Sequence, residues 1–91
     1  MTYEPTVKKR LIARVRRMSG QVSAIERAIT EGAGCTALLH QAAAVRGSVA
    51  RLIDQLVEAH LREKVAHPDL RDVERAEGAD ELIEAMRRYV R

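Results

Sequence analysis

Residues 35–65, CTALLHQAAAVRGSVARLIDQLVEAHLREKV, predict one long amphipathic helix, and this helix decides the fold. Its apolar positions recur at alternating spacings of three and four residues, which is the period of one helix face. They are Leu38, Ala42, Val45, Val49, Leu52, Leu56 and Ala59. The AHPDL motif that follows ends the helix, because the residue before a proline is pushed out of the helical conformation. About 30 residues without a stop give a helix about 45 Å long.

Two further helices flank this one. Residues 5–31 carry an apolar stripe of the same spacing and end at the EGAG motif, since glycine readily adopts the left-handed conformation that closes a helix. The stripe consists of Val7, Leu11, Val15, Met18, Val22, Ile25 and Ile29. Gly20 lies within it and is interpreted as a close packing point. Residues 78–90 form a shorter helix, and no segment alternates like a strand. We therefore expect an all-α, three-helix chain in one domain, residues 1–91.

The composition favours helices that pack against other subunits. The chain has 91 residues, with no Phe or Trp and two Tyr, so its core must be built from aliphatic side chains. A monomer of this size buries only a modest core. The single cysteine provides no disulfide framework and fits a reducing cytoplasm. No apolar run approaches the roughly 20 residues that span a bilayer, so we expect a cytoplasmic protein without a membrane partner.

Positive charge is concentrated near the N-terminus. Residues 1–20 carry six basic side chains and one acidic side chain, although the whole chain has a net charge of +3. The basic residues are Lys8, Lys9, Arg10, Arg14, Arg16 and Arg17. Such a patch attracts polyanions, and the lack of an aromatic platform for stacking bases favours phosphate contacts with double-stranded DNA. A solvated helix face that aids solubility is the alternative.

Cys35 and His60 lie on the same face of the predicted long helix. They are 25 positions apart, about 37 Å along a straight helix, so they cannot meet within one chain. Two such helices packed antiparallel about a two-fold axis would bring Cys35 of one copy beside His60 of the other. This pairing puts the crossing at the small residues Gly47 and Ser48. A symmetric dimer with two Cys35–His60 sites is predicted, and a surface histidine without a role is the alternative.

The chain resembles the CsoR/RcnR family of bacterial transcriptional repressors over nearly its whole length. The resemblance rests on RVRRMSGQVSAIER (residues 14–27), CTALLHQAAAVRGSV (residues 35–49) and EAHLRE (residues 58–63). It implies an antiparallel dimer packed as a four-helix bundle, and a disc-shaped homotetramer made of two such dimers. It also implies operator binding without a helix-turn-helix, and an inducer that releases the DNA. Arg46 resembles a position that the family uses around its DNA face, with an inter-helix ion pair as the alternative.

The resemblance also bears on the inducer, because four positions tell family members apart: Thr2 (with Tyr3), Cys35, His60 and Lys64. Copper sensors carry a second cysteine at the last of these, and nickel and cobalt sensors carry a histidine there and another near the N-terminus. Lys64 provides neither, because an ammonium group does not ligate a metal. Cys35 and His60 alone fall below the three or four ligands of ordinary protein metal sites. Persulfide sensors carry a cysteine where His60 stands.

The remaining resemblance is to the formaldehyde-responsive FrmR branch of the family. There a methylene bridge joins the sensor cysteine to the N-terminal amine, which implies Cys35 and Thr2 in this chain. Those proteins have a proline where this chain has Thr2, so the amine differs. Lys64 is a second candidate amine, with a purely electrostatic role as its alternative. His60 would be a polar neighbour that keeps the thiol reactive, and no cofactor would be needed.

A structural helical oligomer without a ligand is one alternative, but it would leave the basic N-terminal residues and the Cys35–His60 pairing unexplained. Two further functions stay open on the sequence alone. One is a nickel-, cobalt- or copper-responsive repressor of the same family, with one transition-metal ion per subunit held by Cys35, His60 and His67. The other is an enzyme that uses the thiol. An enzyme is not expected, because no Asp or Asn is placed to orient His60 and no enclosed pocket is indicated.

Overall fold

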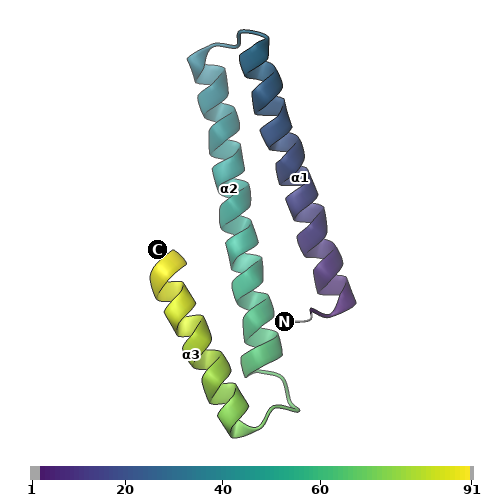
Figure 1. Cartoon of the computed structure of the whole chain (residues 1–91), viewed down its shortest axis with the longest axis vertical. Coiled ribbons are helices and arrows are strands. Elements are labelled where there is room, and N and C mark those ends of the chain that lie inside the picture. Colours follow the sequence, from purple (N-terminus) through teal and green to yellow (C-terminus); the bar gives the residue numbers. More distant parts are fainter. Residues whose placement is uncertain (1–2, 91) are drawn as a thin grey trace. The chain divides into compact units, whose positions relative to one another are not determined.

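The computed structural model describes residues 3–90, which fold into four helical elements. Figure 1 labels the three α-helices. In chain order the four elements are α1 (Pro5–Thr30), α2 (Cys35–His60), the π-helix η1 (Leu61–Val65) and α3 (Asp72–Tyr89). No β-strand occurs in this range, which confirms the predicted all-α class. The chain forms two compact units, one of residues 5–52 and one that combines residues 53–90 with residues 3–4.

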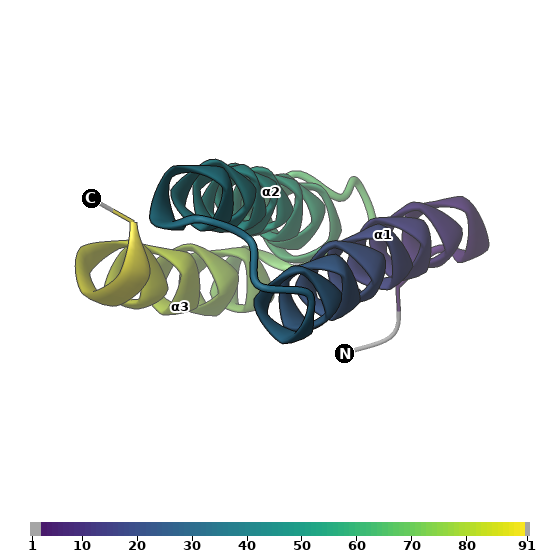
Figure 2. The ribbon, with the colours of Figure 1, turned by 90° about the horizontal axis from the view of Figure 1, so that it is seen from above.

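In the first unit, α1 and the first part of α2 run antiparallel on either side of a short turn (Figures 1 and 2). The turn is built on Gly32, whose φ of 80° lies in the left-handed region. The amide of Ala33 donates to the carbonyl of Ala28 at 2.9 Å, and the amide of Gly32 donates to the carbonyl of Ile29 at 3.1 Å. This pair of bonds closes the last turn of a helix that ends at a glycine. The predicted end of the first helix at EGAG is therefore confirmed.

A polar contact marks the middle of the α1–α2 interface in this unit. Ser48 is buried, and its hydroxyl donates to Oε1 of Gln21 at 2.9 Å. The buried hydroxyl is thus satisfied within the chain, and it ties the two helices at one register. Ser48 consequently faces α1 within the single chain, and the predicted crossing of two copies at Gly47 and Ser48 stays a prediction.

The face of α1 that is turned inward differs from the predicted stripe. Leu11 is buried and Met18 is half-buried, as expected. Val15, Val22 and Ile29, however, are 49%, 53% and 60% exposed. The inward face instead runs through Leu11, Arg14, Met18, Gln21, Ile25 and Ala28. Polar Arg14 and Gln21 thus lie on the inward face. The aliphatic side chains of Val15, Val22 and Ile29 form an exposed apolar ridge on the single chain.

In the second unit, the end of α2 passes directly into η1. The predicted helix end at Val65 is confirmed, but the last turn is a π-helix and not an α-helix. A π-turn has one more residue per hydrogen-bonded ring than an α-turn, and such turns are frequent at functional sites. The amide of Ala66 donates to the carbonyl of Leu61 at 2.8 Å and closes this wider turn.

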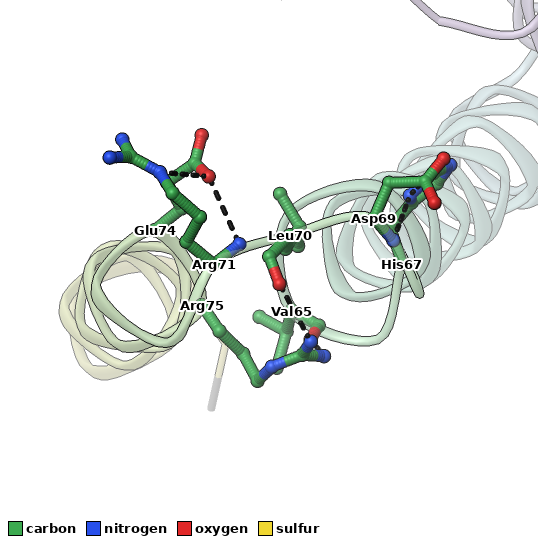
Figure 3. Close-up of polar contacts among 7 residues, drawn as sticks. All are labelled: Val65, His67, Asp69, Leu70, Arg71, Glu74 and Arg75. Carbon is green, nitrogen blue, oxygen red and sulfur yellow. Dashed lines mark hydrogen bonds and ion pairs between the residues drawn. The ribbon is translucent and has the colours of Figure 1, made fainter.

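Helix α3 begins six residues earlier than the predicted start at Gly78. Its first turn is capped by Glu74, whose Oε1 accepts the backbone amide of Arg71 at 3.0 Å and Arg71 Nε at 2.9 Å (Figure 3). Gly78 is buried in the middle of the helix. A Cβ atom at Gly78 would lie 2.9 Å from Cβ of Lys64 and would collide with the Lys64 carbonyl. The glycine therefore marks a close approach between α3 and η1, and the prediction that it begins the helix is wrong.

Candidate sensor site and nucleic-acid interface

Cys35 is the first residue of α2 and carries a free, exposed thiol. It follows Gly34, whose carbonyl accepts the amide of Leu38 at 3.2 Å and so begins the helix. The amides of a first helical turn point toward the helix start, where they favour negative charge. The thiol is thus accessible to a small electrophile.

His60 is the last residue of α2, with a side chain that is only 18% exposed. Its Nε2 lies 2.9 Å from the carbonyl oxygen of Gly78 and 3.9 Å from Oε2 of Glu81. A carbonyl oxygen can only accept, so Nε2 carries the hydrogen. In the neutral imidazole this leaves Nδ1 as a proton acceptor.

An apolar groove of about 470 Å³ lies beside His60 in the second unit. Both aromatic residues of the chain, Tyr3 and Tyr89, line it. The side chains of His60 and Glu81 supply its polar lining. Thr2 lies outside the described residues, but Tyr3 follows it directly in the chain. Tyr3, the first described residue, therefore lies at the groove that contains His60.

Lys64 lies in η1 and is half-buried. Its backbone packs against Gly78, and its ammonium acts on the first turn of α3. The pKa of Glu74 is held below its usual range, mainly by the hydrogen bond from the Arg71 amide, then by the Arg71 side chain, with a smaller electrostatic contribution from Lys64. Lys64 thus belongs to the α3-facing side of η1, in the same unit as His60.

The side chain of Arg75, in α3, forms hydrogen bonds with the end of η1 and with the segment that follows it. Its Nη1 donates to the carbonyl of Val65 at 2.6 Å, and its Nη2 donates to the carbonyl of Leu70 at 3.1 Å (Figure 3). Val65 is the last residue of η1 and Leu70 lies in the η1–α3 connection, so the helical ladder offers neither carbonyl a donor. The guanidinium therefore holds the segment that follows Lys64.

We expect Arg75→Ala to lower the free energy of unfolding by about 1–3 kcal/mol, because two part-buried carbonyls lose a charged donor. Urea unfolding at one fixed protein concentration measures this change. Arg62→Ala is the matched control, since Arg62 forms an exposed ion pair with Glu58 on the same turn of helix, and such pairs contribute about 0.5 kcal/mol or less. Equal losses in the two variants would contradict the role given to Arg75.

His67 forms a local hydrogen bond in the η1–α3 connection. Its Nδ1 accepts the backbone amide of Asp69 at 3.1 Å (Figure 3), which in the neutral imidazole places the hydrogen on Nε2 and leaves no free lone pair. Within residues 3–90 no three His, Cys, Asp or Glu side chains are grouped so that they could hold a metal ion. The donors of one chain, Cys35 and His60, do not make up an ordinary transition-metal site.

The predicted DNA-contacting residues differ in exposure. Five of the six N-terminal basic residues are exposed on α1: Lys8, Lys9, Arg10, Arg16 and Arg17. Arg14 is half-buried, on the same face as Leu11 and Met18. Arg46 is exposed on α2.

Comparison with known proteins identifies the family. Residues 7–88 match the model of the metal-sensitive transcriptional repressors. The chain belongs to this family. It is 32% identical, over the full length of both chains, to a transcriptional repressor RcnR homolog from Escherichia coli O139:H28. It is also 41% identical over both full lengths to an uncharacterized protein in the bioA 5′ region of Serratia marcescens.

A solved structure shares the fold. It is a single-residue variant of the formaldehyde-responsive regulator FrmR from Salmonella enterica serovar Typhimurium, which is 39% identical to this chain. The TM-score is 0.88, and the match covers 98% of this chain and 100% of that one. Since the CsoR/RcnR family consists of transcriptional repressors, this member is a regulator and not an enzyme. None of the helices in residues 3–90 has the length and apolar character needed to cross a bilayer.

Sequence patterns did not reveal the contacts through which Arg75, Gly78 and Tyr3 shape the site of this repressor. Arg75 donates to a backbone carbonyl 10 positions away, and the carbonyl of Gly78 contacts a side chain 18 positions away. Such contacts leave no periodic signal. A glycine inside an otherwise continuous helical pattern was the available signal, because it often marks a close backbone approach. Tyr3 has no comparable signal, because its role comes from where the chain end folds.

Proposed function

We propose that this repressor binds double-stranded operator DNA and is released when formaldehyde joins Cys35 to an amine of a neighbouring subunit. The amine of Thr2 is the first candidate and that of Lys64 the second. The observation that carries the proposal is the groove that Tyr3 and His60 both line. Tyr3, the neighbour of Thr2, lines the same groove as His60, the residue that antiparallel pairing would set opposite Cys35 of a second copy, and this supports Thr2 as the first candidate.

The chemistry needs no cofactor. The Cys35 sulfur attacks the carbon of formaldehyde and forms an S-hydroxymethyl group. An amine nitrogen then displaces the hydroxyl as water, which leaves an S–CH₂–N link and a net gain of one carbon. Nδ1 of His60 on the second copy is the acceptor for the thiol proton, because Nε2 is already engaged by Gly78. The exposed thiol at the start of α2 supports this route.

The exposed side of α2 supports a dimer. Leu39, Val49 and Leu56 are 64%, 38% and 37% exposed in the single chain, although they are apolar. Pairing position 35 with position 60 would set Leu39 against Leu56 of the other copy, which buries both. Since Ser48 is engaged by α1, residues at the crossing are Arg46 and Val49, each opposite the other. The apolar ridge of Val15, Val22 and Ile29 is available for joining two dimers as a homotetramer.

The register of this dimer predicts a charge-dependent effect at position 49. Val49→Lys would place a second cation opposite Arg46 of the other copy twice per dimer, whereas Val49→Glu would place an anion there. Both variants lose the same apolar contact, so the difference between them reports the charge pairing. We expect the lysine variant to dissociate at a roughly tenfold higher concentration than the glutamate variant, measured by sedimentation. Equal dissociation constants would rule out this register.

The exposed cations of α1 are the proposed phosphate contacts, with Lys8, Lys9, Arg10, Arg16 and Arg17 bound directly. Arg46 on α2 is a further candidate. The side chain of Arg14 is half-buried and would have to turn outward to reach DNA. We therefore do not include Arg14 among the direct phosphate contacts. Phosphate contacts orient the protein, and groove shape supplies the specificity.

A release experiment tests the proposed function. The complex of the repressor with its operator is titrated with formaldehyde, and in parallel with nickel, cobalt, zinc and copper(I). The proposal expects release by formaldehyde at concentrations where acetaldehyde, a bulkier carbonyl, has no effect. Release by a stoichiometric metal without any response to formaldehyde would favour the alternative, a metal-responsive repressor that uses Cys35, His60 and His67.

A further inference from the structure

One exposed face of α1 carries cations at both ends and small residues between them. At 100° per residue its members lie within about 40° of one direction. They are Lys9, Ala13, Arg16, Gly20, Ser23 and Arg27, and each is exposed. Within residues 3–90, the side chains of Lys9, Arg16 and Arg27 form no ion pair, whereas Arg62, Arg71 and Arg88 each pair with a glutamate. The cations of this face are therefore available to an external anion.

Two features separate this face from a merely solvated one. The first turn of α1 has no acidic residue, and Lys8 and Lys9 follow at the helix end that disfavours positive charge. Helix α3 shows the opposite, stabilising arrangement, with Asp72 in its first turn and Arg87 in its last. The charges of Lys8 and Lys9 thus oppose helix stability, whereas Arg27 lies in the last turn of α1, where positive charge is favoured. The centre of the face is also open, because nothing lies within 4 Å of a Cβ built on Gly20. The chain itself gives no packing reason for that glycine.

We infer that α1 lies along the DNA with this whole face in contact, and that Arg27 is a phosphate contact at its far end. The inference rests on the proposed DNA binding and extends it from the N-terminal cluster to the full helix. Lys9 and Arg27 are about 27 Å apart along the axis, the length of about eight base pairs. Ala13, Gly20 and Ser23 let the helix backbone approach the duplex between them, and the Ser23 hydroxyl can donate to a phosphate.

Arg27 is tested against a residue in the same structural position. Arg27→Gln and Arg87→Gln each remove one cation from the last turn of a helix, so they match in net charge and in their effect on the helix dipole. The probe is a duplex selected from a random-sequence library by the wild-type protein, and its binding is measured by anisotropy over a range of salt concentrations. We expect Arg27→Gln to weaken binding at least about threefold and to reduce the salt slope by about one per contacting copy, with Arg87→Gln unchanged.

Substitutions at Gly20 test whether the backbone of α1 approaches the DNA duplex closely. Gly20→Ala keeps the face smooth and should bind DNA as the wild type does, whereas Gly20→Gln should bind about tenfold more weakly. Light scattering on both variants measures their oligomeric state, so that weaker DNA binding can be distinguished from a loss of assembly. A Gln variant that dissociates into smaller species would show that Gly20 packs against another copy, and it would overturn the inference.

Other outcomes are equally decisive. If Arg27→Gln and Arg87→Gln have the same affinity and salt slope, α1 does not lie along the duplex and the inference fails, while DNA binding itself stands. If the wild-type protein selects no duplex, the proposed function fails together with the inference.

Discussion

Cys35→Ala stays bound to operator DNA at formaldehyde concentrations that release the wild-type repressor. The expected loss of response is at least tenfold in the formaldehyde concentration at half-release, because alanine offers no nucleophile for the first step of the bridge. Cys35 is exposed at the start of α2, so its replacement leaves no cavity and should not alter folding. Electrophoretic mobility shift with added formaldehyde measures the effect.

Thr36→Ala is the matched control for this variant. Thr36 is the next residue of α2, is exposed, and also carries a small polar side chain that formaldehyde can reach. It should be released as readily as the wild type. If Cys35→Ala were released as well, the thiol would not be the sensor, and an amine-only reaction or a metal would have to explain induction.

Gly78→Ala should lower the free energy of unfolding by about 1–3 kcal/mol. The added Cβ would meet the backbone of Lys64, and a backbone carbonyl in η1 cannot move aside as a flexible side chain can. The displacement of α3 from η1 should also lengthen the contact between His60 and the Gly78 carbonyl. Thermal unfolding at one protein concentration measures the loss, which corresponds to several degrees in Tm for a chain of this size.

Gly20→Ala is the same chemical change, but we expect it to raise the free energy of unfolding. Nothing lies near a Cβ at Gly20, so alanine should stabilise α1 by up to about 1 kcal/mol through its higher helix propensity. If Gly78→Ala proved as stable as Gly20→Ala, the close approach of α3 to η1 would be contradicted.

Periodicity predicted the existence of all three helices, because apolar spacing of three and four is a local property of each segment. It did not settle which face of α1 turns inward. Gln21 and Ser48 form a buried hydrogen bond, so the true interface contains polar residues that an apolar stripe excludes. The start of α3 was also misplaced, since Gly78 interrupts the pattern for a tertiary reason. The capping of Arg71 by Glu74 was the available signal for the earlier start.

The residues of the candidate site were predictable from the sequence, but their tertiary contacts were not. Cys35 and His60 stood out because their chemistry is rare in this chain, and helix geometry alone places them at opposite ends of α2. The tautomer of His60 could not be predicted, because it is set by a carbonyl 18 residues away. The π-turn that carries Lys64 depends likewise on Arg75 and Gly78, which act through space and not through sequence spacing.

The most direct test of the proposed induction is a peptide map of the repressor after treatment with formaldehyde. The account predicts one linked pair of peptides that has gained a single carbon atom and contains Cys35. Its second member is the N-terminal peptide if the Thr2 amine reacts, or the peptide with Lys64 if that amine reacts. Mixing isotopically light and heavy subunits before treatment would show that the link joins two copies. An unmodified Cys35 in protein that formaldehyde has released from DNA would contradict the account.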